Sequence, residues 1–168
     1  MNNNICQCII KQNKFIKINK LFEKIKLFDS SCASLSLSVN VDDRYINTCD
    51  DIMDINSYLE NNTIFLFPGL FLYNNILKIE LNIEHIIAII GHEIGHYKLN
   101  HFNSEQSLQQ EIEADQYSIE ILKKLNMNIY SMINVLGIIF RIKEYKNKLC
   151  SNIIERIVKL DQFLKDLS

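Results

Sequence analysis

A run of isoleucines with helical spacing, ending in two histidines, constrains the fold of this chain more than any other feature. The isoleucines recur every three or four residues, which places them on one face of an α-helix. They are Ile83, Ile86, Ile87, Ile90 and Ile94. Most residues in this stretch are apolar, so the helix is expected to be buried. Asn82 precedes it as a candidate N-cap, with Glu84 in the first turn, where the helix dipole favours an acid.

The two histidines belong to the segment His-Glu-Ile-Gly-His at residues 92–96. Because His92 and His96 are four residues apart, they share a helical face and can aim both imidazoles at one centre. Zinc takes neutral nitrogen donors in a tetrahedral set, and a catalytic site keeps one position for water. Glu93 stands beside the first histidine and can reach a metal-bound water as a general base. Gly95 leaves room for a second backbone to pack closely.

A catalytic zinc site needs a third protein ligand, and the next helical segment offers one. In Glu-Ile-Glu-Ala-Asp at residues 111–115, Glu111 and Asp115 are four residues apart and share a face. Glu111 can bind zinc, and Asp115 can accept a hydrogen bond from the far nitrogen of a ligand histidine and so fix its tautomer. Ala114 permits close approach of the two helices. Glu113 points away from this face and is expected in solvent.

The same spacing also arises by chance on a solvated helix face, which is the competing explanation. Burial argues against it, because two histidines and a glutamate are costly to bury without a metal or a partner. The pattern therefore predicts one zinc ion per chain, held by His92, His96 and Glu111. Of the other histidines, His85 is expected in the core or a groove, and His101 in a capping or surface role.

At these residues the chain resembles the gluzincin metallopeptidases, and within them the HtpX-like and CaaX-prenyl-protease-like group. The likeness is strongest over residues 83–125, in IEHIIAIIGHEIGHYKLNH and EIEADQYSIEILKKL. It implies a zinc-dependent endopeptidase with a zincin-like α+β fold and with the same three zinc ligands. It further implies Glu93 as the general base and Asp115 as the hydrogen-bond partner of a ligand.

The resemblance continues, with departures, on both sides of this helix pair. TIFLFPGLFLY at residues 63–73 resembles the family's strand and turn, which would edge the cleft and pair with an extended substrate. An asparagine expected on that strand is replaced by Thr63, and KLCSNIIERI lacks the His-Pro common in soluble members. Two alternatives therefore remain: an ImmA/IrrE-like regulatory protease, and a catalytically weak zinc-binding regulatory or interaction protein. Asp115, in place of an asparagine, favours the first-named family.

The N-terminal segment predicts a basic amphipathic helix over residues 11–28. Apolar residues at spacings of three and four form one face and lysines form the other. Residues 1–28 carry net charge +5, which leaves −7 on the rest of the chain. Such a helix can lie on a membrane surface or target an organelle, but an ordinary packed helix with solvated lysines is the favoured interpretation.

A small sheet and three further helices complete the predicted architecture. Strict alternation over residues 34–41 predicts a half-buried strand, and residues 42–62 are expected to be mostly loop. The apolar runs at 63–67 and 70–73 predict a hairpin or one bent strand. The expected helices cover residues 108–125, 129–145 and 152–167. The predicted fold is α+β and mostly helical, with the small sheet edging the active-site cleft.

Length and composition bound the remaining choices. A chain of 168 residues with net charge −2 fits one domain over residues 1–168 and carries no nucleic-acid signature. Five cysteines without a CxxC pair fit thiols in a reducing compartment, and no apolar run reaches the length of about 20 residues that a membrane helix needs. We therefore expect a cytoplasmic protease acting on proteins or peptides, with no nucleic acid and no transmembrane segment. Peripheral membrane contact through residues 11–28 is a less favoured alternative.

Overall fold

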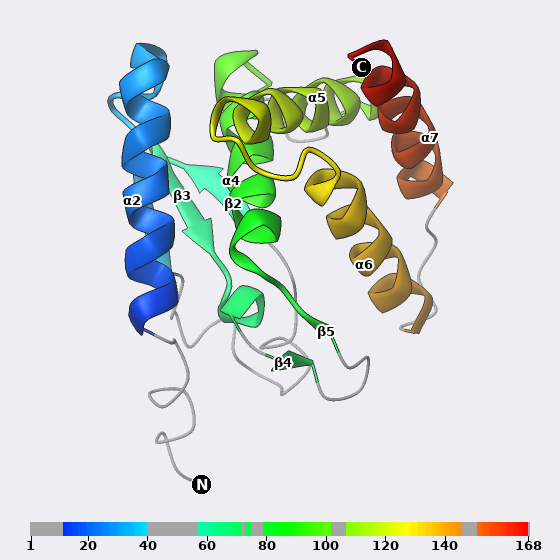
Figure 1. Ribbon diagram of the computed structural model, residues 1–168, viewed down its shortest axis with the longest axis horizontal. Helices are drawn as coiled ribbons and strands as arrows, with labels where there is room; N and C mark the ends of the chain where they lie inside the picture. The colour runs from blue at the N-terminus through cyan, green and yellow to red at the C-terminus, as the bar shows by residue number, and fades with distance from the viewer. Residues whose placement is uncertain are drawn as a thin grey trace, which may run out of the picture. The chain divides into compact units, whose positions relative to one another are not determined.

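The computed structural model describes residues 12–39, 57–71, 73–74, 79–101, 107–145 and 151–167 (Figure 1). Within this part of the chain, helices predominate over short strands, which confirms the α+β class. The helices are α2 (Gln12–Phe28), α4 (Ile83–Lys98), α5 (Leu108–Lys124), α6 (Ser131–Tyr145) and α7 (Ser151–Asp166). The strands are β1 (Ser36–Val39), β2 (Ser57–Glu60), β3 (Thr63–Leu66), β4 (Tyr73–Asn74) and β5 (Ile79–Glu80).

The chain divides into two compact units, Met1–Ile86 and Ile87–Ser168, and the boundary falls inside α4. The prediction that the whole chain forms one domain stays a prediction. Every residue of the predicted metal site belongs to the second unit.

Helix α2 confirms the amphipathic helix predicted from the sequence. Its apolar face is fully buried at Ile18, Phe22 and Ile25, while lysines on the opposite side are exposed. Burial of this face stabilises the first unit, because each buried side chain of this size contributes about 1.5–3 kcal/mol. The ammonium group of Lys14 donates a hydrogen bond to the carbonyl of Leu81, which fastens the helix to the segment just before α4.

The first unit contains a three-stranded sheet with strand order β1-β3-β2. Strand β3 pairs in parallel with β1 and antiparallel with β2, and its alternate residues Ile64 and Leu66 are fully buried. That the sheet edges the active-site cleft stays a prediction, but strand β3 cannot pair with an extended substrate as expected. Both of its edges are already occupied by neighbouring strands, so its backbone groups are taken.

Strand β2 falls in a stretch that the sequence analysis assigns mostly to loop. It exists because Asn61 and Asn62 both adopt positive φ, at 49° and 61°, as the two-residue turn of a tight hairpin requires. The segment after β3 also differs from the hairpin or bent strand predicted there. Pro68–Phe71 forms a 3₁₀ turn, and β4 pairs with β5 instead. Predicted strand residues 40–41 lie outside the described residues.

Helix α4 begins with a reciprocal cap. The side-chain oxygen of Asn82 accepts from the backbone N–H of His85 at 2.9 Å, which confirms Asn82 as the N-cap. The backbone N–H of Asn82 donates to Nδ1 of His85 at 3.3 Å, so the imidazole takes the place that Glu or Gln has in a capping box. His85 is thus a capping residue that is half-buried, and not a core residue. Burial lowers its pKa, opposed by the charge of Glu84 and assisted by that of Lys14.

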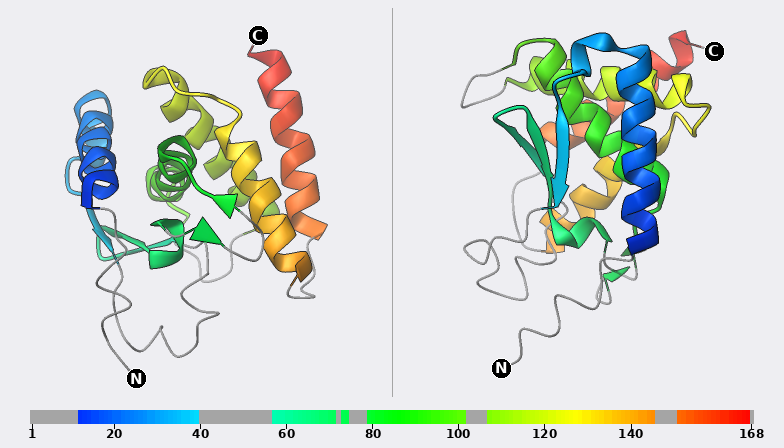
Figure 2. Two further views of the ribbon diagram at one scale, coloured as in Figure 1. Left: turned by 60° about the horizontal axis from the view of Figure 1, so that its bottom comes forward. Right: turned by 90° about the vertical axis from the view of Figure 1, so that its left-hand side faces the viewer.

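In the second unit, α5 has well-defined ends. Ser107 and Gln110 form a capping box at its start. At its end Asn126 has a φ of 54°, a left-handed conformation that ends the helix close to the predicted boundary at residue 125. Helices α6 and α7 lie side by side (Figure 2). Apolar residues of all three helices are buried, among them Ile119, Leu122, Val135, Leu136, Leu160 and Leu164.

None of the helices that the structure describes is both long and apolar enough to cross a membrane. The cytoplasmic location stays a prediction.

Candidate metal centre

Helices α4 and α5 cross in close contact through small residues. A Cβ atom added at Gly95 would lie 2.8 Å from Cα of Ala114, and one at Gly91 would lie 3.0 Å from Cα of Ser118. The distance at Gly95 is one that real Cβ atoms essentially never show, so a side chain there would require the helices to move; the distance at Gly91 is tighter than nine in ten real Cβ contacts, so a side chain there would require its neighbour to shift by a few tenths of an ångström. The hydroxyl of Ser118 donates to the carbonyl of Ala88 at 2.7 Å. The close approach that the sequence predicted at Gly95 and Ala114 is confirmed.

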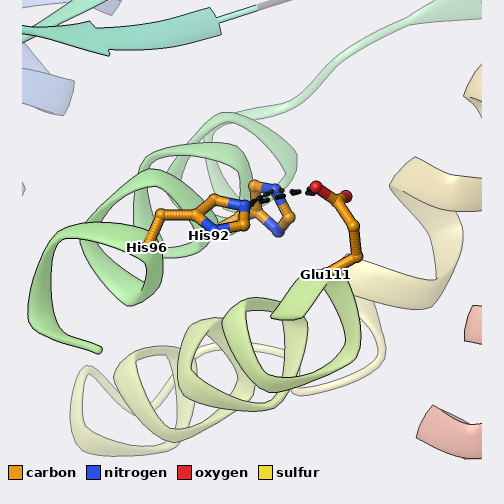
Figure 3. Close-up of side chains that lie close together, drawn as sticks. All are labelled: His92, His96 and Glu111. Carbon is orange, nitrogen blue, oxygen red and sulfur yellow. Dashed lines mark hydrogen bonds and ion pairs between the residues drawn. The ribbon is translucent and has the colours of Figure 1, made fainter. Parts of the chain in front are cut away.

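Three donor groups converge at this crossing (Figure 3). Nε2 of His92 and Nε2 of His96, both on α4, are 3.0 Å apart. Nε2 of His96 is 3.5 Å from Oε1 of Glu111 on α5, and Nε2 of His92 is 3.8 Å from Oε2. Among the described residues, these three were found as a group able to hold a metal ion, with ligand atoms within 4.8 Å of one another.

The spacing of these atoms fits a tetrahedral zinc ion. Zinc–nitrogen and zinc–oxygen bonds of about 2.0–2.1 Å at tetrahedral angles separate neighbouring ligand atoms by about 3.3 Å. The two histidine nitrogens are 3.0 Å apart and Nε2 of His96 is 3.5 Å from Oε1 of Glu111, on either side of that value, and one ligand atom from each of the three residues lies within 4.8 Å of the others. Two imidazole nitrogens and one carboxylate are also a donor set that zinc accepts in catalytic sites. The residues present therefore fit the metal.

Asp115 fixes the tautomer of His92. Its Oδ1 lies 2.8 Å from Nδ1 of His92, and because a carboxylate only accepts, Nδ1 carries the proton and Nε2 keeps its lone pair for a metal. The Asp115 side chain is completely buried. Burial lowers the pKa of His92, but the hydrogen bond and charge of Asp115, with the charge of Glu93, outweigh it and raise that pKa.

Arg156 on α7 joins the two carboxylates of α5, a contact that the sequence analysis did not anticipate. Its Nε and Nη2 donate to the two oxygens of Asp115, each at 2.7 Å. Its Nη1 forms an ion pair with Oε2 of Glu111 at 2.6 Å. Burial of Glu111 disfavours its charge, but His96, His92 and Arg156 outweigh this and lower its pKa to about 2. Both Arg156 and Glu111 are therefore charged at neutral pH.

His101 and Glu113 lie only partly where the sequence predicted. His101 caps the end of α4, as one of its two predicted roles requires, because its backbone N–H donates to the carbonyl of His96 at 2.9 Å. The surface alternative is wrong, because His101 is only 8% exposed and its Nδ1 is 3.1 Å from Nδ1 of His96. Its Nε2 is 3.2 Å from Oε2 of Glu113, so Glu113 does not simply point into solvent. Helical spacing places Glu113 on a different face of α5 from Glu111 and Asp115. That spacing carries no information about His101, which reaches Glu113 from the end of α4.

Glu93 lies next to His92 on α4 and is half-buried. Its negative charge contributes to the raised pKa of His92. Glu93 therefore acts electrostatically on one of the three donors. All the residues predicted for the site thus occur together on α4 and α5. The structure adds Arg156, His101 and Glu113 to them.

Comparison with known proteins gives one family match, to peptidase family M48 over residues 32–109. Neither the curated proteins nor the solved structures gave a match. The family match covers less than half of the chain, includes His92, Glu93 and His96, and ends before Glu111. It agrees with the donor geometry that α4 and α5 create, and it supports a zinc metallopeptidase family for this chain.

Proposed function

We propose that this protein is a zinc-dependent endopeptidase of the HtpX-like and CaaX-prenyl-protease-like kind, acting on proteins or peptides. The observation that carries the proposal is the convergence of His92, His96 and Glu111 within 4.8 Å on two crossed helices. The match to peptidase family M48 supports it independently over the first two of these residues.

Each side chain has a distinct part in the proposed reaction. His92, His96 and Glu111 would hold zinc, which as a Lewis acid polarises a substrate carbonyl and lowers the pKa of water to about 7. Glu93 acts as the general base that removes a proton from the attacking water and passes it to the leaving amine. Asp115 keeps Nδ1 of His92 protonated, so that Nε2 faces the metal.

The surrounding charges support this division of roles. Arg156 offsets the charges of Glu111 and Asp115, two carboxylates that would otherwise repel each other within one helical turn. Since Oε2 of Glu111 is engaged by Arg156, Oε1, at 3.5 Å from Nε2 of His96, is the oxygen left for a ligand bond.

A paired measurement of metal content and peptide cleavage tests the proposal. The zinc-loaded full-length chain is digested against a peptide library, and metal content is measured by elemental analysis. We expect one zinc per chain and internal peptide cleavage. Glu93→Gln should keep the zinc and lower kcat by about 10²–10⁴-fold, the usual contribution of a general base.

Two further variants make the result specific. His96→Ala should lose zinc and activity together, whereas Glu120→Gln, at an exposed position of α5, should change neither. If Glu93→Gln cleaves at the wild-type rate, the role of Glu93 is refuted. If the wild-type chain binds one zinc ion tightly but cleaves nothing in the library, the regulatory zinc-binding alternative replaces the endopeptidase.

A further inference from the structure

The backbone at the end of α4 turns back and brings His101 against His96. Asn100 adopts a φ of 57°, and the backbone N–H of His101 donates to the carbonyl of His96 at 2.9 Å. The N–H of Asn100 donates to the carbonyl of Tyr97 at 3.3 Å. This pair of bonds is the Schellman motif, which ends a helix with one left-handed residue. It places the ring of His101 5.3 Å from that of His96, centroid to centroid.

From His96, a chain of polar contacts leads away from the metal centre to the surface of α5. Nδ1 of His96 meets Nδ1 of His101 at 3.1 Å, and Nε2 of His101 meets Oε2 of Glu113 at 3.2 Å. The other oxygen of Glu113 accepts from the side-chain amide of Gln109 at 3.0 Å. The two histidines are almost fully buried, at 4% and 8% exposure, while the Glu113 side chain is 39% exposed.

The direction of each hydrogen bond in this series of contacts follows from Glu113. Glu113 only accepts, so Nε2 of His101 carries a proton and its neutral ring presents a lone pair at Nδ1. Nδ1 of His96 must then be the donor to that lone pair. A neutral His96 with its proton on Nδ1 carries a lone pair on Nε2, the atom that lies 3.0 Å from Nε2 of His92 and 3.5 Å from Oε1 of Glu111.

We propose that His101 and Glu113 are positioning residues that hold His96 in the tautomer able to bind a metal ion. The inference rests on the proposed zinc site and deepens it. His101 would do for His96 what Asp115 does for His92. Nδ1 of each proposed ligand histidine would then have its own hydrogen-bond partner. Among the described residues, His101 is the acceptor that the structure places at the buried Nδ1 of His96; without it the proton is freer to sit on Nε2, where it would compete with a metal ion.

The test compares variants at His101 and Glu113 by two readouts that do not depend on activity. The first is zinc affinity, measured by competition with a chromophoric chelator. The second is the tautomer of His96 in the metal-free protein, read from ring ¹⁵N chemical shifts. Loss of a hydrogen-bond partner behind a ligand histidine typically weakens metal binding about 10–100-fold, so His101→Phe should fall in that range and lose the Nδ1–H signal of His96.

Three variants separate positioning from packing. His101→Gln keeps an acceptor and a donor on one side chain and should recover most of the affinity. Glu113→Ala, at a partly exposed position where truncation leaves the core intact, should weaken zinc in the same direction but less. Glu120→Gln, at an exposed position of α5, should change neither readout.

Unchanged zinc affinity and an unchanged His96 tautomer in both His101→Phe and Glu113→Ala would overturn the proposal. If His101→Phe does not fold, Glu113→Ala and His101→Gln decide the question alone. If the wild-type chain binds no zinc, the proposed function fails. The ¹⁵N tautomer of His96 still decides whether His101 and Glu113 act on it.

Discussion

Replacing Gly95 by alanine should force α4 and α5 apart. A Cβ atom there would lie 2.8 Å from Cα and 2.9 Å from the carbonyl oxygen of Ala114, and ordinary contact begins at 3.4 Å. Helix α5 would therefore have to move by about 0.6 Å, because both obstructing atoms belong to its backbone and cannot rotate away. Glu111 sits one turn before Ala114, so its carboxylate would move away from the histidines.

Two opposing effects set the size of the change in stability. Alanine is about 1 kcal/mol more favourable than glycine inside a helix. Overpacking a tight interface costs about 1–3 kcal/mol, and a clash against backbone belongs at the upper end. We therefore expect Gly95→Ala to lower the free energy of unfolding of the metal-free protein by about 2 kcal/mol net.

Gly137 on α6 provides the matched control. A Cβ atom there has no neighbour within 4 Å, so Gly137→Ala feels only the gain in helix propensity and should be up to about 1 kcal/mol more stable than wild type. Urea unfolding measures both variants in the presence of a chelator, and zinc competition measures affinity separately. Should Gly95→Ala prove as stable as Gly137→Ala, with undiminished zinc affinity, the close helix crossing would not be what holds Glu111 near the histidines.

Two more predictions concern charged groups around α4 and α5. Arg156→Leu should lower the free energy of unfolding by about 3–5 kcal/mol, because it leaves the fully buried carboxylate of Asp115 and the partly buried one of Glu111 without their cation. A free energy of unfolding within about 1 kcal/mol of wild type would contradict this, and adding Asp115→Asn should restore part of the loss. Burial lowers the pKa of His85 below 6.5, so below that pH the unfolded chain binds the proton more readily and stability falls as pH falls. His85→Gln keeps a side-chain acceptor for the N–H of Asn82 and should flatten the dependence of unfolding free energy on pH; an equally steep profile in the variant would show that another group is responsible.

The convergence of the proposed metal ligands could be predicted because the periodicity of a single helix determines which residues share a face. Four residues separate His92 from His96, and four separate Glu111 from Asp115. Each pair therefore shares a helical face regardless of how the rest of the chain packs. The glycine and alanine between them further indicated that the two helices approach closely. No such local rule connects Arg156 to Asp115, which lies 41 residues away, since their meeting depends on how α7 docks on α5.

Two other omissions had weak signals in the sequence. Consecutive asparagines at 61 and 62 are tolerant of positive φ, and could have indicated the hairpin that creates β2. Asn100 before His101 could have indicated a left-handed helix end that folds the histidine inward. Both signals are a single residue type at one position, whereas the helix pair is supported by periodicity over many residues.

The fork of Arg156 ties the C-terminal helix to the proposed metal centre, because it pairs with Oε2 of Glu111 and with both oxygens of Asp115. Because Asp115 is shared between Arg156 and His92, docking of α7 and the readiness of His92 to bind a metal are thermodynamically linked. Such coupling is reciprocal. If docking of α7 raises the affinity of the centre for a metal ion, then binding of the metal must stabilise docked α7 against local unfolding by the same free energy.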